Sequence, residues 1–148
     1  MKNTTGLETR LDKLCTKTFP YQLPKWFSRT IAGWAWLIIP AVVIVQPWTF
    51  WGYTDDVRAH TAGPNCLFYA AFAVMALEVA LQLMALPGLK EHKESSWRLL
   101  YYSVFCNLAY GVMRIFSSEG SIGPLCGIAL LSAIFFYLLF QVKPWFKK

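Results

Sequence analysis

The stretch NCLFYAAFAVMALEVALQLMAL, residues 65–86, decides the fold of this chain. After Asn65, only Glu78 and Gln82 carry strongly polar side chains in it. A helix of about 20 apolar residues crosses the ~30 Å hydrocarbon core of a bilayer. Similar stretches occupy residues 30–48, 99–116 and 122–142. The sequence therefore predicts an all-α integral membrane protein, a four-helix bundle preceded by a short amphipathic N-terminal helix.

Composition agrees with a membrane protein and argues against a soluble domain. The 148-residue chain is 56% hydrophobic and 15% charged, whereas soluble domains carry about 25% charged residues. We expect residues 1–28 to form a cytoplasmic surface segment and residues 29–148 to form the four-span bundle. The first apolar stretch follows a long polar segment that lacks a small-x-small cleavage site, which favours a retained span over a signal peptide.

The cations predict the orientation of the spans. If each stretch crosses the bilayer once, twelve of the fourteen cations share a compartment with both termini, which indicates cytoplasmic termini by the positive-inside rule. These twelve are Lys2, Arg10, Lys13, Lys17, Lys25, Arg29, Lys90, Lys93, Arg98, Lys143, Lys147 and Lys148. Only Arg58 and Arg114 lie on the other side. Contact with anionic lipid explains the net charge of +6, so we expect no nucleic-acid partner.

The N-terminal segment has the pattern of a short amphipathic helix. Thr5 and Glu8 have the spacing of a capping box, and Leu7, Leu11 and Leu14 share one face. The default interpretation is a helix that lies in the headgroup region. The alternative is a helix that docks onto a partner.

Aromatic residues gather where the predicted spans end, as they do at membrane interfaces. The outer belt comprises Trp48, Trp51 and Tyr53, next to Pro47. The inner belt comprises Trp26, Trp97 and Trp145.

The predicted outer loop, residues 50–64, holds candidate metal ligands. Asp55, Asp56, Arg58 and His60 lie in it, but a solvated polar loop is the default interpretation. The other histidine, His92, is predicted on the opposite side of the membrane, which excludes paired-histidine haem or metal ligation within one chain. We therefore expect no metal and no cofactor.

The four cysteines contain no C-x-x-C motif, which leaves redox and zinc sites without support. Cys66 and Cys126 both fall near the outer face, where a disulfide is an alternative to free thiols.

Glu78 is the main candidate for a site inside the membrane. A carboxylate in hydrocarbon is costly, so it usually faces the bundle interior and has a partner. Gln82 lies one turn further on the same face. At ~1.5 Å per residue, Glu78 and Asn107 have similar depths, and Arg114 lies too far outward to pair with Glu78. The third span presents a polar and small face, formed by Ser103, Asn107, Gly111 and the neighbouring Tyr110.

The fourth span begins with a GxxxG spacing, Gly123 and Gly127, followed by Ala129 and Ala133. Small residues four apart let two helices approach closely in lipid. The spacing predicts a helix contact, either within the chain or with a partner.

The sequence lacks the patterns of known catalytic sites, so we expect no enzyme. The leading hypothesis is a non-enzymatic accessory or assembly subunit, in contact with the lipid bilayer and with another membrane protein or a second copy. The first alternative is a small proton-coupled transporter or channel that uses Glu78. The second is a membrane immunity protein against a pore-forming toxin.

Overall fold

The computed structural model describes residues 6–15, 22–60, 66–117 and 122–146, and its elements are all helical. They are α1 (Gly6–Lys13), α2 (Lys25–His60), α3 (Cys66–Lys90), α4 (Glu94–Ser117), α5 (Ile122–Val142) and the short 3-10 helix η2 (Lys143–Trp145). The prediction of an all-helical chain is confirmed for these residues.

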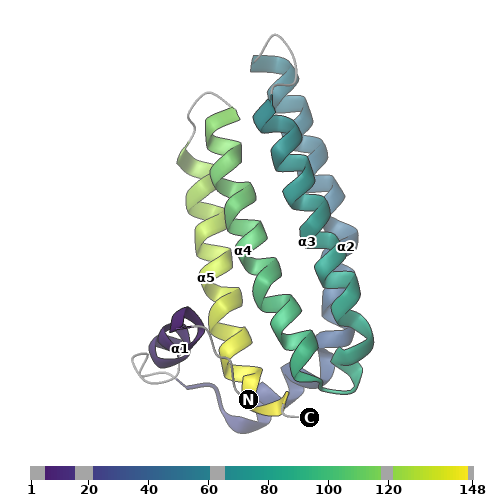
Figure 1. Cartoon of the computed structure of the whole chain (residues 1–148), viewed down its shortest axis with the longest axis vertical. Coiled ribbons are helices and arrows are strands. Elements are labelled where there is room, and N and C mark those ends of the chain that lie inside the picture. The colour runs from purple at the N-terminus through teal and green to yellow at the C-terminus, as the bar shows by residue number, and fades with distance from the viewer. Residues whose placement is uncertain (1–5, 16–21, 61–65, 118–121, 147–148) are drawn as a thin grey trace.

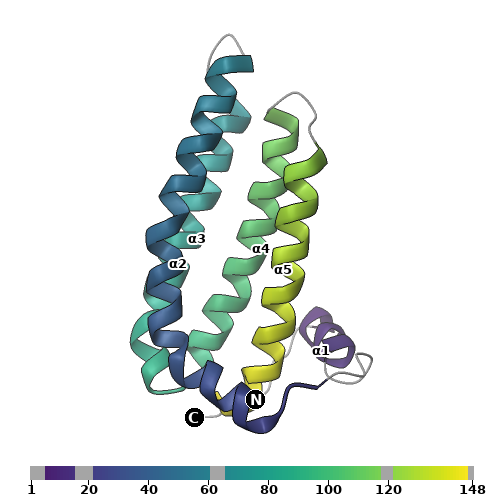
Figure 2. The ribbon, with the colours of Figure 1, turned by 180° about the vertical axis from the view of Figure 1, so that it is seen from behind.

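The helices α2 to α5 lie side by side along the long axis of the molecule, and each runs antiparallel to the next (Figure 1). The helix α2 packs on α3, and α5 packs on α4, with α3 and α4 in extensive contact. Seen from behind, α4 lies between α3 and α5 (Figure 2). The two chain ends of the described structure lie at the same end of the molecule as the α3–α4 connection.

Three of these helices are long and apolar enough to cross a membrane: Lys25–Trp48 in α2, Cys66–Lys90 in α3, and Cys126–Trp145 at the C-terminus. This identifies a membrane protein by length and composition. The helix α4 does not meet these criteria of length and hydropathy, because serine, asparagine, tyrosine and arginine residues interrupt its apolar sequence. It lies beside α3 and α5, and much of its polar face is buried against them.

The prediction of an outer loop at residues 50–64 is wrong for residues 50–60, because α2 continues to His60. Pro40 and Pro47 both lie inside this helix. Each proline lacks an N–H group and leaves the carbonyl four residues earlier without its usual donor, yet neither ends the helix. The residues after Pro47 contain no further helix breaker except Gly52, and Thr54 Oγ1 donates to the Trp51 carbonyl at 2.7 Å.

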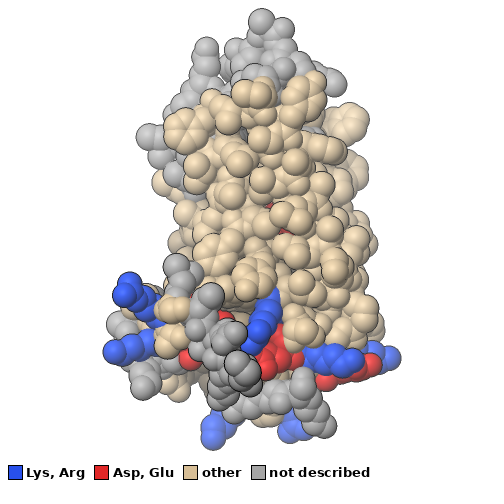
Figure 3. Space-filling view, viewed as in Figure 1, with Lys and Arg blue, Asp and Glu red and all other residues tan. Residues whose placement is uncertain are grey.

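The Lys and Arg side chains drawn in Figure 3 gather at one end of the molecule, and the described surface beyond them is tan apart from a small red area at mid-height. Eight of the twelve cations predicted to share a compartment have described side chains. They lie on α1, at the N-terminal end of α2, in and on either side of the α3–α4 connection, and in η2. Lys2, Lys17, Lys147 and Lys148 lie outside the described residues, as do the side chains of Arg58 and Arg114.

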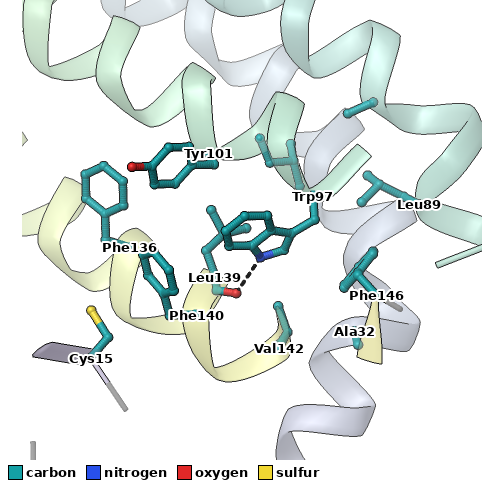
Figure 4. Close-up of a cluster of buried hydrophobic side chains, with 12 residues drawn as sticks. Cys15, Ala32, Leu89, Trp97, Tyr101, Phe136, Leu139, Phe140, Val142 and Phe146 are labelled. Carbon is teal, nitrogen blue, oxygen red and sulfur yellow. Dashed lines mark hydrogen bonds between the residues drawn. The ribbon is translucent and has the colours of Figure 1, made fainter. Parts of the chain in front are cut away.

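A cluster of buried aromatic residues lies next to this charged end (Figure 4). Its centre is Trp97, which is only 1% exposed, so its assignment to the inner aromatic belt is wrong. The Trp97 Nε1 donates to the Leu139 carbonyl at 2.8 Å. That carbonyl belongs to the last turn of α5, where carbonyls lack intrahelical donors. By contrast, Trp26 and Trp145 remain accessible, as expected of belt residues.

The α3–α4 connection is tight, because the two helices approach closely there. His92 adopts φ 55°, in the left-handed region, and the Lys93 N–H donates to the Gly88 carbonyl at 2.9 Å. A Cβ on Gly88 would overlap Ser96 Oγ. Glycine at position 88 therefore permits the close approach of α3 and α4.

The helix α1 docks onto the chain itself, beside the C-terminal half of α5 (Figures 1 and 2). Lys143 Nζ donates to Glu8 Oε1 at 3.0 Å, and Gln141 Nε2 donates to the Cys15 carbonyl at 3.3 Å. Burial, with a smaller contribution from Asp12, raises the pKa of the Cys15 thiol, which disfavours the reactive thiolate. Thr5 and the side chain of Leu7, part of the predicted amphipathic pattern, lie outside the description.

Candidate functional site: an intramembrane polar cluster

Polar side chains from four helices meet around Glu78. We name this group the Glu78 cluster; it comprises Gln46 of α2, Glu78 and Gln82 of α3, Asn107 of α4 and Ser132 of α5. Glu78 itself is only 3% exposed. A buried carboxylate needs hydrogen bonds to offset the loss of its hydration. The cluster therefore places an acid inside the helix assembly, not on its outer surface.

Three amide groups donate hydrogen bonds to the Glu78 carboxylate. Gln46 Nε2 donates to Oε1 at 2.7 Å, and Gln82 Nε2 donates to the same oxygen at 3.1 Å. Asn107 Nδ2 lies 3.2 Å from Oε1 and 3.4 Å from Oε2. The predicted meeting of Glu78 and Asn107 is confirmed, and so is the shared face of Glu78 and Gln82.

The cluster extends to α5 through Asn107. Ser132 Oγ donates to Asn107 Oδ1 at 3.2 Å, so the Asn107 amide joins Glu78 on one side and Ser132 on the other. Among the described residues, none of the ion pairs includes Glu78. The carboxylate is thus held by neutral donors, and its bonds tie α2, α3 and α4 together.

Ser103 and Tyr110, which were also predicted on the polar face of α4, have other surroundings. Ser103 Oγ donates to the Leu100 carbonyl at 2.8 Å, within its own helix. Tyr110 is buried and packs with Ala71 and apolar residues of α3 and α5. The Arg114 side chain is outside the description.

The glycines that were predicted to mediate helix packing have different surroundings in the structure. Gly111 lies at the α4–α5 contact, where an added Cβ would be 2.8 Å from Ile128 Cγ2. Gly127 has no atom within 4 Å of the position of a Cβ, so it faces away from the other described helices. The surroundings of Gly123 lie outside the description.

A cavity of about 140 Å³ adjoins the Glu78 cluster. Gln82, Ser103, Asn107 and Ser132 supply its polar lining. Its apolar walls come from α2, α4 and α5, and are formed by Ile39, Val42, Leu100, Val104, Leu131, Phe135 and Leu139. A mostly apolar lining with a few convergent polar groups is typical of small-ligand sites, but this cavity is smaller than their usual volume of about 300–1,000 Å³.

Sequence reasoning missed two members of the cluster, Gln46 and Ser132. A depth count across the α4–α5 connection would have found Ser132. Asn107 lies ten residues before the end of α4 at Ser117, and Ser132 lies ten residues after the start of α5 at Ile122. Gln46 and Glu78 lie fourteen and twelve residues from His60 and Cys66, the facing ends of α2 and α3. Similar depth in antiparallel neighbours was therefore an available signal for Ser132, whereas the count for Gln46 requires the end of α2 at His60, which was not predicted.

Metal and redox chemistry gain no support from the part of the chain that the structure describes. No group of three or more His, Cys, Asp or Glu side chains converges there. The side chains of Asp55, Asp56, Arg58 and His60, the candidate metal set, lie outside the description. Cys66 and Cys126 are free and exposed.

Comparisons of the chain with protein-family models, with curated proteins and with solved structures give no match. The chemistry and geometry of the site are therefore the basis for the function proposed below.

Proposed function

We propose that this chain is a non-enzymatic accessory or assembly subunit of a membrane complex. In this proposal α2 to α5 form a four-span bundle with cytoplasmic termini, and α5 contacts a transmembrane helix of another membrane protein. The observation that carries the proposal is the open position of Gly127 on an apolar helix face.

The face around Gly127 has the composition of a helix-packing surface. Leu130 and Ile134 follow it at spacings of three and seven residues and are exposed. Residues with these spacings share one side of a helix. Two helices in lipid gain little from burying leucine alone, whereas a glycine lets their backbones approach and improves dispersion contact. A partner helix would gain that contact here.

The bonding of Glu78 favours the subunit over the proton-coupled transporter. Its carboxylate is engaged by three amides from three helices, which is what a residue that fixes helix packing requires. A proton carrier would also need a path to each side, and no second carboxylate takes part in the described cluster. The adjacent cavity is the observation that keeps the transporter as a second candidate.

Replacing Gly127 with leucine is expected to leave the isolated protein unchanged and to abolish assembly. The new side chain meets open space within the chain, but it would overpack a contact with a partner, which typically costs about 1–3 kcal/mol. Gly33→Leu is the matched control, because Gly33 of α2 also has nothing within 4 Å. The measurement is thermal unfolding in detergent, together with the stoichiometry of any protein that co-purifies from the native membrane.

Both variants should unfold at the wild-type temperature, and only Gly127→Leu should lose the co-purifying protein. If Gly127→Leu destabilises the isolated chain, the contact is internal. If Gly127→Leu remains stable, assembled and active, the face of α5 around Gly127 contacts lipid and the proposal is wrong.

The proposed orientation predicts the labelling of a cysteine placed at Lys93. This residue lies in the α3–α4 connection, among the cations of the charged end. On a background without native thiols, Lys93→Cys should resist a membrane-impermeant maleimide in intact cells and react after permeabilisation. Strong labelling in intact cells would overturn the cytoplasmic location of the termini.

A further inference from the structure

The cavity beside the Glu78 cluster has a polar lining of defined hydrogen-bonding character. Gln82 is only 6% exposed, and its Oε1 has no hydrogen-bond partner in the described part of the chain. The Gln82 amide must present its nitrogen to Glu78, because a carboxylate accepts hydrogen bonds. The carbonyl oxygen is therefore left on the other side of the amide, where it has almost no accessible surface, so Gln82 lines the cavity through its other side-chain atoms.

Both hydroxyl groups of the cavity lining already donate a hydrogen bond within the protein. Ser103 donates to the Leu100 carbonyl, and Ser132 donates to Asn107 Oδ1. A hydroxyl group has one proton and two lone pairs, so both oxygens can still accept a hydrogen bond. The Asn107 nitrogen is directed at Glu78. The cavity thus offers acceptors and favours a ligand that donates.

The size and walls of the cavity restrict the ligand further. Its volume of about 140 Å³ is close to that of an engineered apolar cavity of about 150 Å³ that binds benzene. Leu131 and Phe135 form part of its wall and are also exposed on the outer surface of α5. Ile39 and Val42 of α2 form the wall on the other side of this opening. A ligand would therefore enter from the lipid, between α2 and α5, and would be uncharged.

We propose that this cavity is a binding site for a small uncharged aromatic ring that carries a hydroxyl group, a phenol. The ring lies against the apolar walls from α2 and α5, and its hydroxyl donates to a serine oxygen of the lining, Ser103 Oγ or Ser132 Oγ. This site is separate from the proposed contact with a partner at Gly127, and it is tested on the isolated protein.

The first test compares two ligands that differ only in the donor. The purified chain in lipid nanodiscs is titrated with 4-fluorophenol and with 4-fluorotoluene, and fluorine NMR follows binding. The two rings have nearly the same size, but the methyl group cannot donate. We expect saturable binding of one 4-fluorophenol per chain and a Kd for 4-fluorotoluene that is roughly fivefold higher or more, since a net hydrogen bond has about that effect.

The second test fills the cavity. Val42→Phe places a ring in the cavity wall, whereas Val45→Phe makes the same change on the exposed side of the same helix. Val42→Phe should abolish saturable binding, and Val45→Phe should retain the wild-type Kd. Equal, unsaturable uptake of both ligands by the wild-type chain would overturn the proposal without any variant. So would unchanged binding of 4-fluorophenol to Val42→Phe.

Discussion

Replacing Glu78 with leucine is expected to destabilise the folded chain by about 2–4 kcal/mol. The substitution removes the one acceptor shared by Gln46, Gln82 and Asn107. An interhelical hydrogen bond in a membrane protein contributes only ~0.6 kcal/mol on average. The larger effect is the penalty for buried donors that lose their acceptor, which is about 1–3 kcal/mol for a buried group. Part of this penalty is recovered if the three amides form hydrogen bonds with one another.

Glu78→Gln is the matched control for this prediction. A glutamine keeps a carbonyl oxygen at the position of Oε1, which receives the bonds from Gln46 and Gln82. Its amide nitrogen replaces Oε2, whose contact with Asn107 is the longer one, at 3.4 Å. We therefore expect Glu78→Gln to be nearly silent in thermal unfolding in detergent and in assembly.

The two variants separate the structural role of Glu78 from proton transport. A Glu78→Leu variant as stable as the wild type would show that the cluster does not hold the helices together. A Glu78→Gln variant that folds and assembles normally but lacks function would favour the proton-coupled transporter.

The pairing of Glu78 with Asn107 was predictable because helical geometry and a short connection fix it. Glu78 lies twelve residues before the end of α3 at Lys90, and Asn107 lies thirteen residues after the start of α4 at Glu94. With a constant rise per residue, equal counts from a tight connection mean equal depth. The only further requirement is that the two polar faces turn toward each other, and burial of an acid in lipid enforces it.

The role of Gln46 was not predicted because α2 was expected to end where its apolar stretch ends, at Trp48. Pro47 and the tryptophan that follows it, Trp48, resemble the end of a span, which put Gln46 at the membrane boundary. In the structure α2 continues to His60. The helix tolerates Pro47 at the cost of one backbone bond, so Gln46 lies well inside a helix, where its side chain reaches Glu78.

The contrast between Trp26 and Trp97 shows that sequence position alone does not decide whether a tryptophan near a span end is exposed or buried. Both residues lie at the charged end of their helices, and both fit an interfacial belt. Trp26 is 70% exposed, whereas Trp97 is almost fully buried. The difference comes from tertiary packing: α4 lies between two helices, and the last turn of α5 presents a carbonyl to the Trp97 indole. An interfacial belt and a buried core both favour tryptophan at these positions, so the local sequence does not distinguish them.

Trp97→Ala is therefore expected to cost about 3 kcal/mol or more in the free energy of unfolding. Truncation of a buried large aromatic side chain typically costs 3–5 kcal/mol because of lost contacts and the cavity left behind. The Trp97 ring stacks on Tyr101 with centroids 5.5 Å apart, and Lys143 Nζ lies 4.8 Å from its centroid. The Leu139 carbonyl also loses its donor.

Trp26→Ala makes the same truncation on an exposed residue and should change the unfolding free energy by less than about 0.5 kcal/mol. Trp97→Phe separates the two contributions at the buried site, because it keeps a ring but removes the N–H group. It should cost about 1–2 kcal/mol, between the wild type and Trp97→Ala. Unfolding by denaturant in detergent measures all three. Equal effects of Trp26→Ala and Trp97→Ala would mean that both residues belong to the interfacial belt, and that α4 does not pack on α5 through this ring.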